Sequence, residues 1–195
     1  MKTSFWHRLL AYIIDIILVG LTASVICSAL PKNNSAYESE LTSLQNELIN
    51  GEITADKYIE EYKDVLYNNN KDNKVETAVS FLLTIGYFVV FQYMNNGQTL
   101  GKKMLKIRVV DNNTNKSPTV LKGLVRTVIV FNIVSSFASL VLINYLSKSA
   151  YISTYITISE IEYLLITMSI IFIIFRKDGR GIHDLISNTK VIEER

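Results

Sequence analysis

Four stretches of the chain are nearly free of charged residues, and they dominate the hydrophobic pattern. The clearest covers residues 9–30, whose 22 residues contain a single formal charge, Asp15. At about 1.5 Å rise per helical residue it extends roughly 33 Å, enough to cross a hydrocarbon core about 30 Å thick. The pattern predicts four transmembrane helices, at residues 9–30, 75–94, 124–146 and 157–175.

The fourth of these spans has an alternative interpretation. Glu160 and Glu162 lie near its start, and its strictly apolar part is only residues 163–175. A hairpin that dips into the membrane from one side is the alternative to a full crossing. We expect a full crossing, with both carboxylates in the outer headgroup region.

The first span also has two interpretations. Lys2 and Arg8 precede an apolar run, as in a secretory signal peptide. The run is longer than the roughly 7–15 residues of a signal-peptide core, and Asp15 lies inside it. We therefore expect a helix that is retained in the mature protein.

The distribution of charge between the spans predicts their orientation. Residues 95–123 carry six basic residues and one acidic residue, a net of +5, whereas residues 31–74 carry five basic and nine acidic residues, a net of −4. Short loops rich in Lys and Arg stay in the cytoplasm. Both termini and the 95–123 loop are therefore predicted to be cytoplasmic, and the acidic segment to lie outside.

The acidic segment has helical patterning of its own. Apolar residues recur at helical spacing on either side of Asn50-Gly51, which is a natural helix stop, and Thr54 is placed to cap the second helix. This predicts a helical-hairpin insert at residues 35–70. A decorated linker is the simpler interpretation of its role, because the insert contains no cluster of ligating or catalytic residues.

The basic loop is predicted to lie against the membrane and to form part of a small sheet. Its lysines are placed to meet anionic lipid headgroups. Residues 107–110 are β-prone and end at a turn signal, and residues 189–192 are similar. We expect these two segments to pair as a cytoplasmic ribbon, and the headgroup contacts to come from Lys102, Lys103 and Lys106.

Asp15 needs a structural reason, because an ionisable side chain at that depth costs several kcal/mol unless it is paired or faces water. Arg126 enters the third span from the same side and is a candidate partner, and Gln92 ends the second span there. Arg8 points to the same side of the first helix as Asp15, but seven residues is too far for a direct contact. One interpretation is that these groups only hold helices together. The other is that Asp15 binds a cation or a proton in a water-filled recess.

The sequence gives little support to enzymatic chemistry. His183-Asp184 is the other polar concentration, but a zinc or two-metal site needs more ligands than its neighbourhood offers. No Ser or Cys nucleophile with a base and an orienting acid is visible. We expect neither an enzyme nor a cofactor, and the single cysteine excludes a disulfide framework.

The polar motifs, taken in order, resemble those of the RDD family of bacterial membrane proteins. They are FWHRLLAYIID at residues 5–15, GQTLGK at 97–102, IRVVD at 107–111, Arg126, RGIHD at 180–184 and TKVI at 189–192. Arg8, Asp15 and Asp184 match the residues that name the family. The resemblance implies a location in the bacterial cell membrane and transport of an unknown ligand, with cation/proton exchange suggested for some members.

The sequence therefore predicts one all-α membrane domain over residues 1–195, with about four transmembrane helices, the outer hairpin and the small cytoplasmic ribbon. Its net charge of +2 gives no reason to expect a nucleic-acid partner. Two functions remain open: a transporter, acting as a homo-oligomer because four helices are few for a pathway, and a scaffold or sensor that binds another protein. The candidate binding residues are Arg8, Asp15, Arg126 and Asp184, supported by Gln92 and His183.

Overall fold

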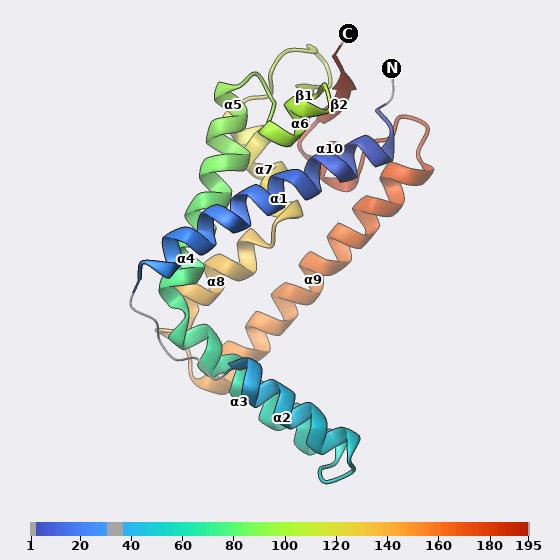
Figure 1. The fold of residues 1–195 in the computed structure, drawn as a ribbon. Coiled ribbons are helices and arrows are strands. Elements are labelled where there is room, and N and C mark those ends of the chain that lie inside the picture. The colour runs from blue at the N-terminus through green and yellow to red at the C-terminus, as the bar shows by residue number, and fades with distance from the viewer. Residues whose placement is uncertain (1–2, 31–36, 195) are drawn as a thin grey trace.

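The computed structural model describes residues 3–30 and 37–194, which form a mostly helical chain with a two-stranded sheet (Figure 1). Its elements, in chain order, are α1 (Phe5–Ser28), α2 (Tyr37–Ile49), α3 (Ala55–Asp72), α4 (Lys74–Ile85), the π-helix η1 (Gly86–Phe91), α5 (Gln92–Met94), α6 (Leu100–Met104), β1 (Ile107–Asp111), α7 (Val120–Val130), α8 (Ile133–Leu142), α9 (Lys148–Phe175), α10 (Ile182–Ile186) and β2 (Thr189–Glu193).

Three continuous helical segments are long and apolar enough to cross a membrane. They are Phe5–Ser28, Lys74–Met94 and Lys148–Phe175, with mean hydropathies of 2.4, 1.6 and 2.0. Few of their side chains are buried inside the protein, as expected for helices that face lipid on most sides. The predicted first and second spans are confirmed as helices, and the protein is an all-α, multi-pass membrane protein.

The third predicted span, residues 124–146, is not one straight helix. It consists of α7 and α8, whose axes differ by 81° across a short break. Asn132 lies at this break with φ 51° and ψ 39°, a left-handed conformation that Asn tolerates better than most residues. The backbone can therefore turn sharply here without a glycine or a proline.

The fourth span is the longest helix. The prediction of a full crossing agrees with α9, a continuous helix of 28 residues, but α9 begins at Lys148 rather than near residue 157. Ser147 caps it by accepting a hydrogen bond from the Ala150 N–H at 3.5 Å. The predicted position of Glu162 in the outer headgroup region is wrong, because the residue lies near the middle of this helix and is 4 % exposed.

The predicted hairpin is formed by α2 and α3, which pack against each other and project from one end of the molecule (Figure 1). Thr54 caps α3 by accepting a hydrogen bond from the Lys57 N–H at 3.3 Å, as the sequence indicated. Residues 35 and 36 of the predicted insert lie outside the described residues. The inner end of α3 packs on the start of α9, where Tyr67 meets the fully buried Tyr151 edge-on.

The predicted ribbon is confirmed as the antiparallel pair β1 and β2, with Val109 opposite Val191. These two valines pack with Ile107 against Ala11 of α1, so the sheet covers the first turns of that helix. The ribbon, α6, α10 and both ends of the described chain lie at one end of the bundle, opposite the hairpin (Figure 1).

Candidate functional site

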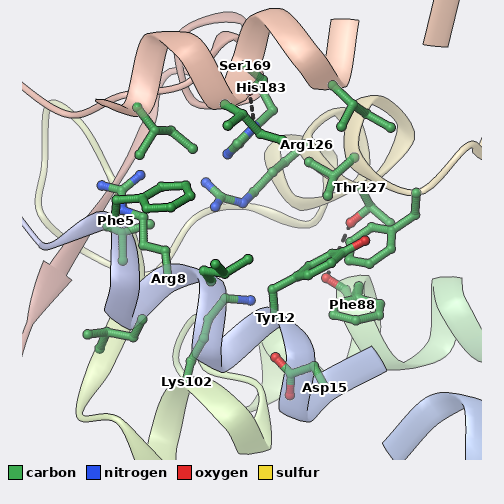
Figure 2. Close-up of a pocket in the computed structure, with 18 of the residues that line it drawn as sticks. Phe5, Arg8, Tyr12, Asp15, Phe88, Lys102, Arg126, Thr127, Ser169 and His183 are labelled. Carbon is green, nitrogen blue, oxygen red and sulfur yellow. Dashed lines mark hydrogen bonds between the residues drawn. The ribbon is translucent and has the colours of Figure 1, made fainter. Parts of the chain in front are cut away.

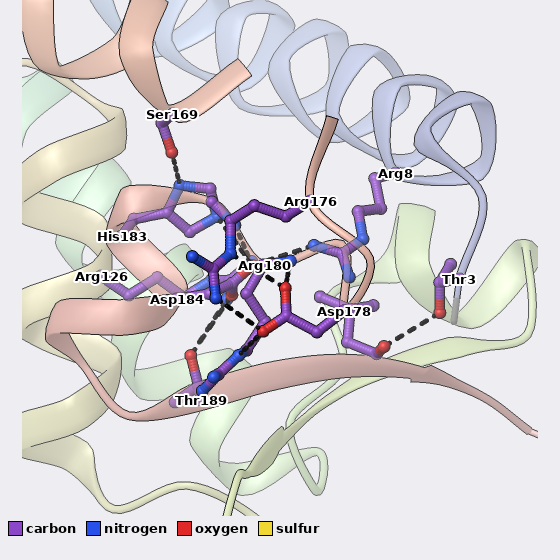
Figure 3. A network of polar contacts seen from close by, with 12 residues as sticks. Thr3, Arg8, Arg126, Ser169, Arg176, Asp178, Arg180, His183, Asp184 and Thr189 are labelled. Carbon is purple, nitrogen blue, oxygen red and sulfur yellow. Dashed lines mark hydrogen bonds and ion pairs between the residues drawn. The ribbon is translucent and has the colours of Figure 1, made fainter. Parts of the chain in front are cut away.

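Asp184 in α10 is fully buried and is held by arginines from two other elements (Figure 3). Its Oδ2 accepts a hydrogen bond from Arg8 Nη1 of α1 at 2.9 Å, and its Oδ1 is paired with Arg126 Nη1 of α7. The Gly181 N–H, which begins α10, donates to Oδ2 at 3.2 Å. One carboxylate thus connects α1, α7 and α10.

The charge of this carboxylate is maintained by its neighbours. Burial by itself would raise the pKa of Asp184, but the positive field of Arg126 and Arg8 outweighs burial and holds that pKa below its usual range. Removal of the carboxylate would leave two buried guanidinium groups without their counter-charge. Such a change typically destabilises a protein by about 3–5 kcal/mol.

His183 is a neutral connector beside this ion cluster. Its Nδ1 lies 2.6 Å from Ser169 Oγ of α9, and its Nε2 lies 3.5 Å from Asp184 Oδ2. Burial lowers the pKa of His183 to about 3, so the ring is uncharged at neutral pH. Gly181 allows this contact, because a Cβ there would lie only 2.5 Å from Ser169 Oγ.

Asp15 occupies a second, separate cluster that contains no arginine. Its Oδ1 accepts hydrogen bonds from Tyr87 Oη at 2.7 Å and from the Gly101 N–H at 2.8 Å, and its Oδ2 accepts one from Thr99 Oγ1 at 2.5 Å. The side chain is fully buried. The cluster fastens α6 and η1 to α1 through hydrogen bonds from uncharged donors.

The expected pairing of Arg126 with Asp15 is therefore wrong, and Arg8, which is too far along α1 to contact Asp15, does not pair with it either. Both guanidinium groups pair instead with Asp184, which the sequence analysis had placed in the site without a partner. Asp15 lies about 10 Å further along α1 than Arg8, by helix geometry, and meets the loop before α6. Tyr87, Thr99 and Gly101 were not predicted as partners, although the last two belong to the GQTLGK motif.

The GQTLGK motif is explained by this contact. Gly97 adopts φ +85° and lies against the Val109 carbonyl, where no side chain fits. Thr99 caps α6 by accepting from the Lys102 N–H at 3.4 Å while its hydroxyl donates to Asp15. At Gly101 a Cβ would lie 2.4 Å from the Ala11 carbonyl oxygen, so α6 approaches α1 closely only because this residue is a glycine.

Lys102 was expected to contact lipid headgroups, but its ammonium group lies against other residues of the protein. Its side chain turns inward (Figure 2). It donates a hydrogen bond to Gln92 Oε1 of α5 at 2.7 Å. The close approach of Gly101 to α1 fixes α6 so that this lysine faces the interior. Lys103 and Lys106 are exposed and remain available for the predicted headgroup contact.

Burial and nearby charge act together on Lys102. Burial lowers its pKa, repulsion from Arg126 lowers it further, and attraction to Asp15 and Asp184 opposes both, so that the pKa is about 7. The ammonium group therefore gains and loses its proton near neutral pH.

The two clusters border one cavity of about 260 Å³ (Figure 2). Its polar lining comes from six elements and comprises Arg8, Asp15, Gln92, Lys102, Arg126, Thr127, Ser169 and His183. Its apolar lining includes Tyr12, Phe88, Phe131, Ile166 and Ile170. Six predicted site residues, Arg8, Asp15, Gln92, Lys102, Arg126 and His183, line this cavity, while Asp184 lies behind it.

Glu162 is a buried carboxylate that sequence reasoning misplaced. Its Oε1 accepts from the Val134 N–H at 2.9 Å and its Oε2 from the Ser135 N–H at 3.2 Å, at the start of α8. A carboxylate is favoured at a helix N-terminus, where backbone N–H groups lack partners. Glu162 was misplaced because α9 starts nine residues earlier than predicted. A helix predicted from Lys148 would have placed Glu162 near its middle.

Within residues 3–30 and 37–194, no group of three or more His, Cys, Asp and Glu side chains is arranged to hold a metal ion. The fold and the site define a polytopic helical membrane protein with a charged cavity at one end of its bundle.

The model of the RDD family matches residues 2–188, and the chain belongs to that family. The resemblance inferred from the motifs is thereby confirmed. Comparison with curated proteins and with solved structures gives no match.

Proposed function

We propose that this RDD-family protein is a membrane transporter and that the cavity bordered by α1, α7 and α9 is its substrate site. The observation that supports this is the convergence of charged side chains from α1, α6 and α7 on a cavity within the bundle. Ionisable groups at membrane depth are costly and mark substrate or ion pathways more often than not. We propose transport rather than catalysis for this site.

Asp15 is the candidate for exchanging a proton during transport. As a carboxylate it accepts hydrogen bonds from Thr99 and Gly101, which hold α6 against α1. Protonation would weaken both bonds and loosen α6, which carries Lys102 into the cavity. Proton binding at Asp15 would in this way change the charge and shape of the substrate site, and cation/proton exchange is one form that such coupling takes.

Flux measurements in proteoliposomes test the proposal. We expect a pH-sensitive dye inside the vesicles to report proton movement when a Na⁺ or K⁺ gradient is imposed, and Asp15→Asn to abolish it. Glu160→Gln, which alters an exposed acid on α9, is the matched control and should retain the flux. Unchanged cation-driven flux in Asp15→Asn would exclude cation/proton exchange at this residue.

The proposed setting is the bacterial cell membrane, with both termini and the ribbon in the cytoplasm and the hairpin outside. The basic residues of the 95–123 loop support this orientation. There, Lys103 and Lys106 would contact anionic headgroups. A four-span bundle encloses little of a continuous pathway, and we propose that the protein acts as a homo-oligomer.

A scaffold or sensor is the second candidate function, and the projecting hairpin favours it. Ile49 and Ile59 of the hairpin are 79 % and 48 % exposed, beyond the apolar spans. Replacing residues 42–62 by a short Gly-Ser link would remove this surface and leave Tyr67 on α9. We expect affinity purification of the shortened chain to lose a protein partner that the full chain recovers; equal recovery would argue against this candidate.

A further inference from the structure

We infer that the cavity binds an anionic amphiphile: a molecule with a compact anionic head, carboxylate or phosphate, and one acyl chain. The inference rests on the proposed transport function and names an anionic substrate for the same site in place of Na⁺ or K⁺. The inference depends on three features of the cavity: its charge, its lining, which is basic in one part and apolar in the rest, and the side on which it is open.

The charge of the cavity is positive when Lys102 is protonated. Arg8, Arg126 and Lys102 point into it from α1, α7 and α6 (Figure 2), and two carboxylates oppose them. Both of these carboxylates are already engaged, Asp184 by the two arginines and Asp15 by hydrogen bonds from α6 and η1. A bare cation would meet three cationic groups and no unpaired anion, whereas an anionic head would meet the missing counter-charge.

One donor at this position has no protein partner. Arg8 Nε is buried and makes no hydrogen bond within the part of the chain that the structure describes. Buried polar groups without a partner are rare, because no hydrogen bond compensates the free energy lost when they are removed from water. Arg8 Nη1 is fixed on Asp184, so the guanidinium is oriented, and its remaining donors and the Lys102 ammonium are available to anionic oxygens.

The rest of the cavity suits an acyl chain. Its walls away from the basic residues are aromatic and aliphatic, with Phe131 and Ile166 lying deeper in the bundle. At about 260 Å³ the cavity is slightly smaller than the roughly 300–1,000 Å³ of pockets that enclose a whole drug-sized ligand. It therefore holds a headgroup and the first part of a chain, not an entire lipid.

The cavity is open on the side where a chain would continue. Tyr12 of α1 and Ile170 of α9 both line it, yet they are 40 % and 43 % exposed on the apolar surface of their helices. Since both residues belong to membrane-spanning segments, this opening faces acyl chains rather than water. An amphiphile can enter sideways from the bilayer, with its head towards the ribbon and its tail among lipids.

The binding test uses native mass spectrometry on the full chain in detergent. The probes are oleate, oleoyl lysophosphatidate, oleyl alcohol and inorganic phosphate. We expect oleate, lysophosphatidate or both to be retained, and neither the alcohol nor phosphate. Retention of one of the two acids alone would identify the head as carboxylate or phosphate. Equal retention of oleyl alcohol, retention of phosphate alone, or no retention of any probe would overturn the inference.

Paired variants locate the binding. Lys102→Gln should weaken retention about tenfold or more, the effect of losing one charge-assisted hydrogen bond, and the exposed neighbour Lys103→Gln should not. Ile170→Trp should fill the cavity and abolish retention, whereas Ile171→Trp, on the same helix outside the lining, should retain it. If each control variant loses as much amphiphile retention as the variant it is matched with, the amphiphile is bound elsewhere and the inference fails.

Protonation of Lys102 gives an independent readout. The titratable and polar groups that face it are Arg126 from α7, Asp15 from α1, Asp184 and His183 from α10 and Gln92 from α5. Because its pKa is about 7, the ammonium is charged below that pH and neutral above it. Wild type should therefore retain more of the amphiphile than Lys102→Gln at pH 6 and an equal amount at pH 8.5. A difference in retention that is the same at both pH values would contradict a role for this charge.

Binding and transport can fail separately. Retention of oleate that is lost in Ile170→Trp, without any flux in proteoliposomes, would support the amphiphile site and contradict transport. A cation-driven flux that depends on Asp15, without retention of either acid, would support transport and overturn the amphiphile.

Discussion

Single residues decide how closely the elements of the site approach one another, and Gly101 sets the approach of α6 to α1. Its N–H donates to Asp15 at 2.8 Å, and its α-carbon lies against the Ala11 backbone. Burial of Asp15 depends on this approach, because Thr99 and Gly101 supply two of its three hydrogen bonds. One missing side chain therefore permits both the anchoring of α6 and the inward direction of Lys102.

The substitution Gly101→Ala should destabilise the protein by about 1–3 kcal/mol, the usual consequence of overpacking. The new Cβ would lie 2.4 Å from the Ala11 carbonyl oxygen, and backbone must move to relieve it. Thermal unfolding in detergent measures the effect. Gly20→Ala is the control, since nothing lies within 4 Å of a Cβ there and alanine favours a helix; equal loss in both variants would contradict the close-approach argument.

At the scale of elements, the break between α7 and α8 is held by a residue of α9. Glu162 accepts hydrogen bonds from the first N–H groups of α8, so its carboxylate replaces the preceding turn that a continuous helix would supply. The 81° bend is therefore stabilised by a side chain rather than by local sequence alone. The same contact fixes α8 against the middle of α9.

Glu162→Gln should lower stability by about 0.5–2 kcal/mol, the range for losing a helix cap. Glutamine keeps the size of the side chain but has one acceptor oxygen where the carboxylate has two, and it loses the favourable charge at the helix N-terminus. The measurement is the midpoint of thermal unfolding in detergent, with Glu160→Gln as the control. An equal decrease for the exposed Glu160 would assign the effect to general charge loss on α9.

Elements that depend on local pattern were predictable from the sequence. The ribbon segments and the first two spans follow from apolar runs and β-branched residues within a few positions of each other. The start of α9 was missed because Lys148 and several hydroxyl residues interrupt the apolar run before Tyr155. The α7–α8 break was missed because an Asn in the left-handed conformation leaves no local signal as strong as Gly or Pro.

The site was predictable in membership but not in pairing. The residues of the cavity were identified because charge near an apolar span requires an explanation. The pairing of Arg8 could not be predicted, because Arg8 and Asp184 are 176 positions apart in the sequence. The hydrogen bond between Thr99 and Asp15 could not be predicted for the same reason, since they are 84 positions apart. Charge alone favoured Asp15 as the partner of Arg126, and only the position of α10 showed that Asp184 takes that place.

On the scale of the whole molecule, the polar ribbon end and the projecting hairpin lie at opposite ends of the spans (Figure 1). The bent pair α7–α8 must serve as one crossing if the chain is to return to the ribbon end, and α9 then completes the return. This arrangement makes the orientation testable with two exposed residues, Asn113 beside the ribbon and Asn50 in the hairpin.

In a Cys27→Ser background, we expect a membrane-impermeant maleimide to label Asn50→Cys on intact cells and Asn113→Cys only after lysis. The reason is the excess of Lys and Arg near the ribbon, which retains that end in the cytoplasm. Labelling by mass shift on a gel measures both sites. The opposite pattern would invert the proposed orientation, and labelling of both sites on intact cells would contradict a crossing between them.

The shared carboxylate of Asp184 also has a consequence for biosynthesis. A ribosome releases Arg8 and Arg126 into the membrane long before it adds the residue that neutralises them. Until then the nascent chain carries two guanidinium groups whose counter-charge has not been made, so its first helices remain incompletely docked. Premature termination just before Asp184 would leave a polypeptide whose two guanidinium groups lack that counter-charge, and quality-control proteases can recognise such an incompletely docked chain.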